Sequence, residues 1–205
     1  MTISEDSNAQ TLEDWAGAQD LGLTLAFTDI VDSTNIGIKL GDIRWIENLF
    51  VHFSSARTFA FRYDCYVVKA IGDSLMMAFR TSSEAVQFAM EFSVDTGVNY
   101  IGIRVGIHSG QVEIRENDIY GLNVNFTSRV QHALPGEGIL VTDRVQRDYD
   151  RKFGKDSGVR FIPREVPLKS FGKETVLFVA TPELAKARRN HFEGRTSLLR
   201  AGRTS

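Results

Sequence analysis

The spacing of apolar residues along the chain predicts short buried strands between amphipathic helices. The first strong signal is the stretch from Leu23 to Thr34, where a nearly continuous apolar run gives way to small polar residues. Such a run is typical of a strand buried on both faces of a sheet. Asp29 lies at the end of this run, at the edge of the expected fold. Two interpretations are open: Asp29 binds a cation beside a phosphate-binding turn, or it caps the next helix.

Apolar residues at helical spacing predict two long helices, one over residues 42–62 and one that Ser82 or Ser83 caps and that extends to Phe92. Between them, strands at 65–70 and 74–79 flank the tight turn Ile71-Gly72-Asp73, so Asp73 lies at the mouth of a hairpin. The other expected elements are shorter. They are strands at 101–108, 112–114 (after a turn at Ser109-Gly110), 138–141, 159–166 and 176–179, and helices at 35–40, 118–133 and 144–149.

The order of these elements predicts an α+β fold with a ferredoxin-like βαββαβ core, a central antiparallel sheet with flanking helices. In that arrangement the first and third strands are antiparallel neighbours. Because Asp29 ends the first strand and Asp73 precedes the third, we expect the two carboxylates to lie side by side. Hard oxygen ligands suit Mg²⁺ or Mn²⁺, with a polyphosphate completing the coordination. The coincidence favours metal binding over helix capping for Asp29.

A second candidate site lies on the helix expected after Asp118. Asn125 and Arg129 are four residues apart and therefore project from one helix face. A guanidinium keeps its charge, and its planar fork matches phosphate oxygens, so an arginine aimed into a cleft stabilises a phosphoryl-transfer transition state. Taken alone, such a pair is more often a solvated part of a helix surface.

Composition indicates one globular domain and excludes several classes of protein. The 205 residues are 42% apolar and 24% charged, which is enough for a sizeable core. No apolar run approaches the roughly 18 residues of a membrane-spanning helix, and the N-terminus lacks the features of a signal peptide. The single cysteine, Cys65, excludes an internal disulfide, so the cytoplasm is the expected compartment. A net charge of −2 gives no case for nucleic-acid binding.

Charge is concentrated at the two ends of the chain. Residues 1–20 contain five acidic residues and no basic one, whereas residues 181–205 contain six basic residues and two acidic ones. We therefore expect an acidic arm at 1–20, a folded domain at 21–180 and a basic tail at 181–205. Either both ends are simply solvated, or the acidic arm contacts the basic tail within a dimer.

Five motifs, taken in their order and spacing, resemble the class III nucleotide cyclases, the family of adenylyl and guanylyl cyclase catalytic domains. They are FTDIVDST (27–34), KAIGDS (69–74), RVGIHSG (104–110), DIYGLNVNFTSR (118–129) and LKSFGK (168–173). The resemblance extends from about Leu21 to Val179. It implies a phosphorus–oxygen lyase that converts a nucleoside triphosphate into its 3′,5′-cyclic nucleotide and pyrophosphate.

The resemblance also implies which residues act in that reaction. Asp29, the backbone of Ile30 and Asp73 match the residues that bind two divalent metal ions, Mg²⁺ or Mn²⁺. Asn125 matches the residue that orients the ribose. Arg129 matches the residue that stabilises charge on the α-phosphate as pyrophosphate leaves.

Three further residues match those that hold the substrate. Lys169 corresponds to the lysine on the β- and γ-phosphates, and Lys69 with Asp118 corresponds to the pair that recognises the nucleobase. In that family the metal-binding carboxylates come from one subunit and the base-recognition and Asn/Arg residues from the other. The resemblance therefore implies a head-to-tail homodimer with two identical sites.

The nucleobase stays open between two alternatives. A Lys/Asp pair is the one that adenylyl cyclases of the family use, which implies ATP. Departures from the family pattern favour a smaller base: Thr127 replaces an alanine, bulky Phe126 is its neighbour, and Asp32 replaces a glycine. Phe50 and Tyr63 lie on, or just past, the helix expected at residues 42–62. Bulk at the pocket would shorten it, and a cytosine satisfies the same two polar residues. Ordinary helix packing is the alternative for Phe126.

The layout of the chain bears on the same question. A cyclase domain without a sensor or membrane module resembles the stand-alone pyrimidine cyclases of bacterial antiphage defence, which make cyclic UMP or cyclic CMP for a separately encoded effector. A further alternative is a non-catalytic nucleotide-binding module on the same fold. The presence together of Asp29, Asp73, Asn125 and Arg129 argues for catalysis, because a binding module has no need of the full set.

Overall fold

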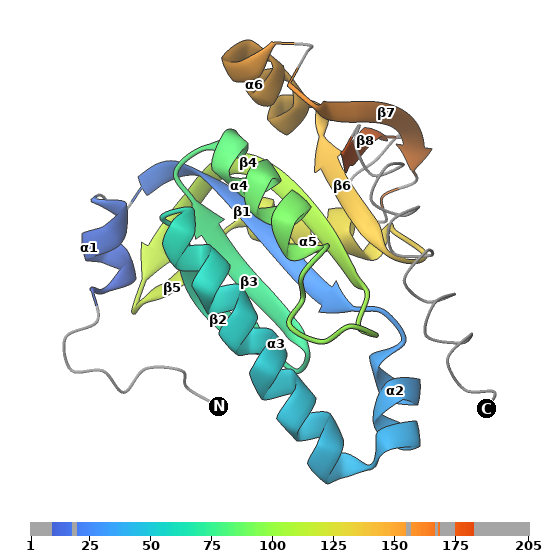
Figure 1. The fold of residues 1–205 in the computed structure, drawn as a ribbon. Coiled ribbons are helices and arrows are strands. Elements are labelled where there is room, and N and C mark those ends of the chain that lie inside the picture. Colours follow the sequence, from blue (N-terminus) through green and yellow to red (C-terminus); the bar gives the residue numbers. More distant parts are fainter. Residues whose placement is uncertain (1–9, 18–19, 155–156, 167, 169–174, 183–205) are drawn as a thin grey trace.

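The chain folds around one mixed sheet, which a computed structural model describes for residues 10–17, 20–154, 157–166, 168 and 175–182. The expected βαββαβ order is confirmed, and it forms the ferredoxin-like core (Figure 1). The core elements are β1 (Asp20–Ile30), α2 (Ser33–Leu40), α3 (Asp42–Arg62), β2 (Tyr66–Ile71), β3 (Ser74–Phe79), α4 (Ser82–Phe92) and β4 (Ile103–Arg115).

Further elements extend this core at both ends. They are α1 (Leu12–Ala16), β5 (Asp118–Tyr120), α5 (Leu122–His132), β6 (Gly138–Thr142), α6 (Asp143–Phe153), β7 (Val159–Val166) and β8 (Thr175–Pro182). The strand order is β2-β3-β1-β4-β6-β8-β7, and β5 pairs with β4 alone. Within the described part of the chain, no helix is long and apolar enough to cross a membrane.

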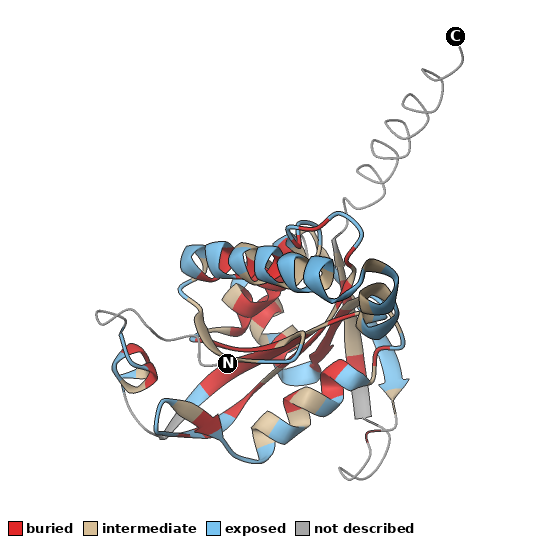
Figure 2. Cartoon of the chain, turned by 90° about the horizontal axis from the view of Figure 1, so that it is seen from below, coloured by how far each residue is buried: buried red, intermediate tan, exposed pale blue. Residues whose placement is uncertain are grey.

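Helices cover both faces of the sheet, which leaves buried strands between them (Figure 2). Alternate residues of a strand point to opposite faces. Ala26 and Met77 therefore pack toward α3 and α4, whereas Leu25, Phe27 and Met76 pack on the other face, where α1 lies. The expectation that β1 is buried on both faces is confirmed.

The long strand β4 differs from the prediction of a turn at Ser109-Gly110, because the strand continues without interruption to Arg115. Gly110 has another purpose there. A Cβ atom at this position would lie 2.4 Å from the Asn123 side chain, so the glycine permits α5 to approach the strand. A glycine that serves close packing and one that serves a turn look alike in the sequence.

Two helix starts also differ from the prediction. Asp118 lies in the short strand β5, and α5 begins only at Leu122, after Gly121 at a φ of 130°. The cap of α4 is Thr81, not Ser82 or Ser83. Its side chain accepts a hydrogen bond from the Glu84 amide while the Glu84 carboxylate accepts one from the Thr81 amide, the reciprocal arrangement of a capping box.

The two charged ends lie largely outside the described residues, which exclude 1–9 and 183–205. Within the expected acidic arm, however, α1 packs against the domain, since Leu12 is fully buried and Trp15 is 5% exposed. The domain boundaries at 20 and 180 stay a prediction.

Replacing Gly106 by alanine is expected to loosen α5 from the sheet. A Cβ atom there would lie 2.3 Å from the backbone nitrogen of Gln131, and a helix backbone cannot rotate away as a side chain can. We expect a loss of about 1–3 kcal/mol in the free energy of unfolding, measured in urea. Gly136→Ala is the control, because a Cβ at Gly136 has nothing within 4 Å. Equal stability of the two variants would contradict this account.

Candidate active site

Asp29 and Asp73 lie at the same end of the sheet, on neighbouring segments. Strands β1 and β3 are antiparallel, with Thr28 opposite Leu75. The Ser74 hydroxyl donates a hydrogen bond of 2.7 Å to Asp29 Oδ1, and Asp73 is the residue before Ser74 in the turn between β2 and β3. The two carboxylates, here called the carboxylate pair, are thus brought together as the βαββαβ arrangement predicts.

Arg104 is a member of this site that the sequence did not reveal. It lies directly opposite Asp29 in the β1–β4 pairing, and its Nε and Nη2 atoms donate to Asp29 Oδ2 at 2.7 and 2.6 Å. The pair is only partly exposed. Its motif, RVGIHSG, is present in the sequence, but the contact depends on the register of two strands far apart along the chain. Arg104 therefore supplies a fixed positive charge beside the carboxylate pair.

The donor set of the carboxylate pair fits a hard divalent ion. Asp73 Oδ2 is buried and has no hydrogen-bond partner among the described residues. A buried carboxylate oxygen without a partner suits a metal ligand. No group of three or more His, Cys, Asp or Glu side chains that would hold a metal occurs in the described ranges. The protein would thus supply two carboxylates and the Ile30 backbone, leaving further coordination to substrate oxygens and water.

The turn after β1 leads into α2, and the first amides of that helix are the candidate anion-binding groups. Asp32 has a φ of 60°, a left-handed conformation that a glycine adopts freely and an aspartate tolerates. Its side chain makes no capping hydrogen bond to α2, so none of the first amides of that helix is satisfied by its N-cap side chain. Such amides are available to a phosphate.

Lys69 and Asp118, for which the resemblance implies recognition of the nucleobase and which are here called the base-recognition pair, are in direct contact. Lys69 Nζ lies 2.5 Å from Asp118 Oδ2, and the other oxygen of Asp118 accepts a hydrogen bond of 2.8 Å from the Ile119 amide. The lysine and aspartate side chains are 39% and 23% exposed, so the pair is open to a ligand. Residues 49 positions apart are thereby joined at one point.

A β-bulge in β2 determines where Lys69 points. Val67 is opposite Met77 and Lys69 is opposite Met76, which leaves Val68 as the extra residue. Val68 and Met76 belong to one face of the sheet, and Val67 and Met77 to the other. In a regular strand Lys69 would share the face of Val67, so the bulge turns it toward Asp118. Nothing in the sequence signals this bulge.

Asn125 and Arg129 lie on the outward side of α5. Both are exposed, and among the described residues neither side chain forms a hydrogen bond or an ion pair. Thr127, midway between them, is fully buried against the sheet. Since residues two positions apart on a helix point about 200° from each other, Asn125 and Arg129 point away from their own sheet.

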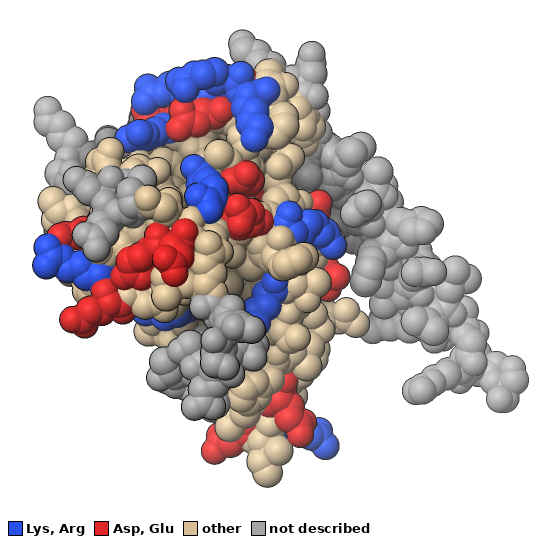
Figure 3. Space-filling view, turned by 90° about the vertical axis from the view of Figure 1, so that its left-hand side faces the viewer, with Lys and Arg blue, Asp and Glu red and all other residues tan. Residues whose placement is uncertain are grey.

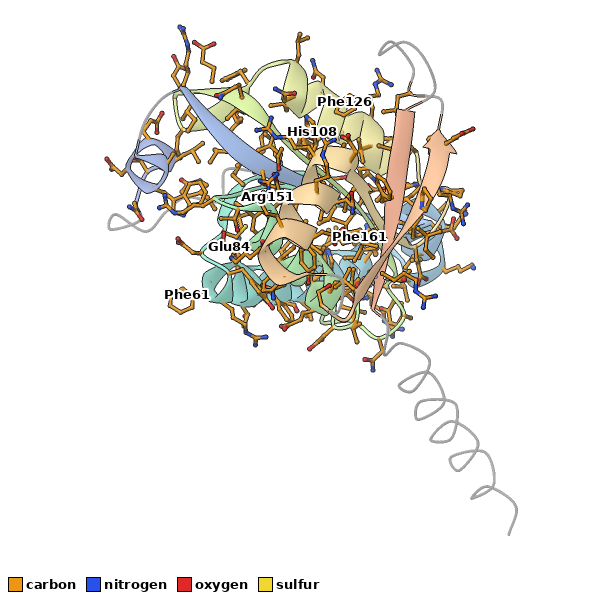
Figure 4. The ribbon with its side chains drawn as sticks, turned by 90° about the horizontal axis from the view of Figure 1, so that it is seen from above. Phe61, Glu84, His108, Phe126, Arg151 and Phe161 are labelled. Carbon is orange, nitrogen blue, oxygen red and sulfur yellow. The ribbon has the colours of Figure 1, made fainter. Side chains whose placement is uncertain are left out.

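Phe126 packs within its own chain, as the alternative to a pocket role predicted. Its ring meets His108 edge-on at 4.7 Å (Figure 4). Burial lowers the pKa of His108, and its hydrogen bond with Asn123 acts in the opposite direction. Thr127 is buried, with its hydroxyl donating to the Asn123 carbonyl at 2.6 Å.

The other residues considered for the pocket are placed as follows. Tyr63 packs edge-on against Phe88 at a centroid distance of 6.3 Å, and Phe50 is 54% exposed on α3. Lys169, the expected ligand of the β- and γ-phosphates, lies outside the described residues.

Comparison with known proteins agrees with this geometry. A family model described as the adenylate and guanylate cyclase catalytic domain matches residues 19–179. The chain belongs to the class III nucleotide cyclases. The match covers all described residues named above for the carboxylate pair, the base-recognition pair and α5.

Curated relatives of this cyclase domain are much longer proteins. The receptor-type adenylate cyclase ESAG 4 of Trypanosoma brucei brucei is 26% identical over 207 residues, covering 78% of this chain and 17% of that protein. Receptor-type adenylate cyclase B of Leishmania donovani is 27% identical over 172 residues, covering 60% of this chain and 13% of that protein. The chain therefore spans less than a fifth of the length of either relative.

Solved structures share the fold. An adenylate cyclase of Trypanosoma brucei in its monomeric state has a TM-score of 0.69 at 23% identity, covering 80% of this chain and 89% of that one. The adenylyl cyclase CyaB of P. aeruginosa has a TM-score of 0.70 at 18% identity, covering 80% and 95%. The guanylate cyclase domain of RhGC from Catenaria anguillulae, in complex with GTP, has a TM-score of 0.66 at 23% identity, covering 80% and 99%.

Proposed function

We propose that this cyclase domain converts ATP into 3′,5′-cyclic AMP and pyrophosphate at sites shared by two copies of the chain. The observation that carries the proposal is the carboxylate pair at one end of a cyclase-family sheet: Asp29 lies beside Asp73, whose buried Oδ2 has no hydrogen-bond partner among the described residues. A site of this kind suits an in-line displacement at phosphorus, which depends on positioning and charge stabilisation. A cyclic nucleotide product in turn requires an effector that binds it.

The proposed roles follow from side-chain chemistry. Divalent ions held by Asp29, Asp73 and the Ile30 backbone, when bound, would activate the ribose 3′-hydroxyl and neutralise the triphosphate. Asn125 orients the ribose through hydrogen bonds, and Arg129 stabilises the charge that develops on the α-phosphate. Lys169 holds the terminal phosphates.

A second copy of the chain completes the site in this proposal. Asn125 and Arg129 are exposed and lie on the side of α5 opposite the buried Thr127, whereas Asp29 is a member of the sheet. Among the described residues Arg129 forms no ion pair with the carboxylate pair of its own chain, which supports an arrangement in which a second chain supplies the arginine. A head-to-tail dimer brings α5 of one copy to the carboxylate pair of the other.

Adenine suits the base-recognition pair. Asp118 accepts from an exocyclic amino group, and Lys69 donates to a ring nitrogen, as both groups are available at a partly exposed contact. The case for a pyrimidine rested partly on bulk from Phe126 and Thr127. Both residues pack within their own chain, Phe126 against His108 and Thr127 on the Asn123 carbonyl, which weakens that case. The names of relatives that are adenylate cyclases also support ATP.

The experiment that tests this proposal incubates the purified protein with Mn²⁺ and, separately, ATP, GTP, CTP and UTP, and identifies products by mass spectrometry. Cyclic AMP is the expected product. Formation of cyclic UMP or cyclic CMP would mean that the substrate is a pyrimidine nucleotide and not ATP, and would favour a role in antiphage signalling. No cyclic product from any of the four would leave a nucleotide-binding module as the function.

A further inference from the structure

The turn between β4 and β5 is held by α1, which lies 105 residues earlier in the sequence. The Leu12 amide of α1 donates to Asn117 Oδ1 at 2.6 Å, and the Asn117 amide donates back to Glu13 Oε1 at 3.0 Å. Tyr66 of β2 adds a third contact, since its hydroxyl lies 3.1 Å from the same Asn117 oxygen. Asn117 is the residue immediately before Asp118 of the base-recognition pair.

The sequence of this turn is unfavourable for the backbone conformation that it adopts. Arg115 pairs with Asp118, so Glu116 and Asn117 form a two-residue hairpin loop, with φ values of 51° and 60°. Such loops strongly prefer asparagine and glycine, because other residues are strained at positive φ. Glutamate at the first position weakens the turn. The hydrogen bonds from α1 offset that weakness and fix the loop conformation.

Helix α1 is itself anchored to the hairpin that carries Lys69. Trp15 donates from its indole nitrogen to Asp64 Oδ1 at 3.2 Å, and the Arg80 guanidinium lies 4.7 Å from the centre of the indole ring. Arg80 Nε is also bonded to Asp64 at 3.0 Å. Basic and acidic side chains accordingly lie next to one another on the face of the molecule that carries α1 (Figure 3).

We propose that α1 is a clasp that positions the base-recognition pair through Asn117. The helix joins the β2–β3 hairpin, which carries Lys69, to the β4–β5 hairpin, which carries Asp118. Asn117 is a positioning residue that contacts no substrate, and release of α1 loosens Asp118 relative to Lys69. This inference rests on the proposed function of the pair in nucleobase recognition. Under this proposal, a change in how the segment before β1 packs would alter which nucleotide the site selects.

The test compares Asn117→Gly with Glu116→Gly in the full-length protein. Both variants place a glycine at a positive-φ position of the same turn, but only the first removes the side chain that α1 holds. We expect Asn117→Gly to raise the KM for ATP roughly fivefold with kcat nearly unchanged, because a loosened Asp118 loses about the worth of one hydrogen bond to the base. Its preference for ATP over the other nucleoside triphosphates should fall, and amide exchange in residues 118–120 should become faster. Glu116→Gly should leave all of these unchanged.

Equal effects of the two glycines, or no effect of Asn117→Gly on KM and exchange, would overturn the clasp. A fall in kcat with unchanged KM would also overturn it, because a loosened base-recognition pair weakens binding first. If the unmodified protein forms no cyclic nucleotide, the proposed function fails, and hydrogen exchange alone then decides whether α1 holds Asp118.

Discussion

An equimolar mixture of the Asp73→Ala and Arg129→Ala proteins is expected to regain activity, although each variant alone is nearly inactive. Loss of a transition-state charge partner such as Arg129 lowers kcat about 10²–10³-fold. If each site takes its carboxylate pair from one copy and its arginine from the other, a mixed dimer has one site with both defects and one intact site. Random pairing makes about half of the dimers mixed, so the mixture should show about one quarter of the unmodified rate.

The matched control mixes Asp73→Ala with Asp29→Ala. Both changes affect the carboxylate pair, so no pairing of these two proteins restores an intact site, and the mixture should stay inactive. Product formation is followed by mass spectrometry, and sedimentation velocity establishes whether the variants still associate. Failure of the first mixture to exceed its components, in proteins that do associate, would show that one chain supplies the whole site.

Much of this site is predictable because it depends on the order of the strands and helices along the chain and not on the register in which the strands pair. Asp29 ends an apolar strand and Asp73 opens a hairpin strand, so the ferredoxin-like arrangement alone brings them together. Asn125 and Arg129 follow from helical spacing in the same way. These predictions tolerate errors of several residues in the ends of the elements, as the later start of α5 at Leu122 demonstrates.

The parts that escaped prediction depend on register and on non-local packing. Arg104 meets Asp29 only because β1 and β4 pair at that offset. Lys69 and Asp118 are paired by the family resemblance and not by any local pattern, because their contact depends on the bulge at Val68 in β2. A five-residue helix such as α1 has too few turns for a periodic signal, and its fixation comes from contacts with Asn117 and Asp64 far along the chain. Tertiary contacts of this kind leave no local pattern.

The two carboxylates should respond alike in catalysis and differently in stability when each is changed to asparagine. We expect both variants to lose activity about 10³-fold with either Mg²⁺ or Mn²⁺, since an amide oxygen is a weaker ligand for a hard cation and several kcal/mol of charge stabilisation is lost. Calorimetric titration with Mn²⁺ and a non-cyclisable ATP analogue should show weakened metal binding in each. The catalytic loss alone would not separate a ligand from a residue that merely maintains the fold.

The free energy of unfolding distinguishes a metal ligand from a residue that maintains the fold. Asp29 accepts hydrogen bonds from Ser74 and Arg104, so Asp29→Asn leaves a half-buried guanidinium without its counter-charge and should cost about 1–3 kcal/mol in unfolding free energy. Asp73 Oδ2 is buried with no partner among the described residues, so Asp73→Asn should be neutral or stabilising, as is common when a site is organised for function at the expense of stability. Urea denaturation without metal measures both values. A destabilised Asp73→Asn protein would mean that Asp73 supports the fold, and its loss of activity would then no longer identify it as a metal ligand.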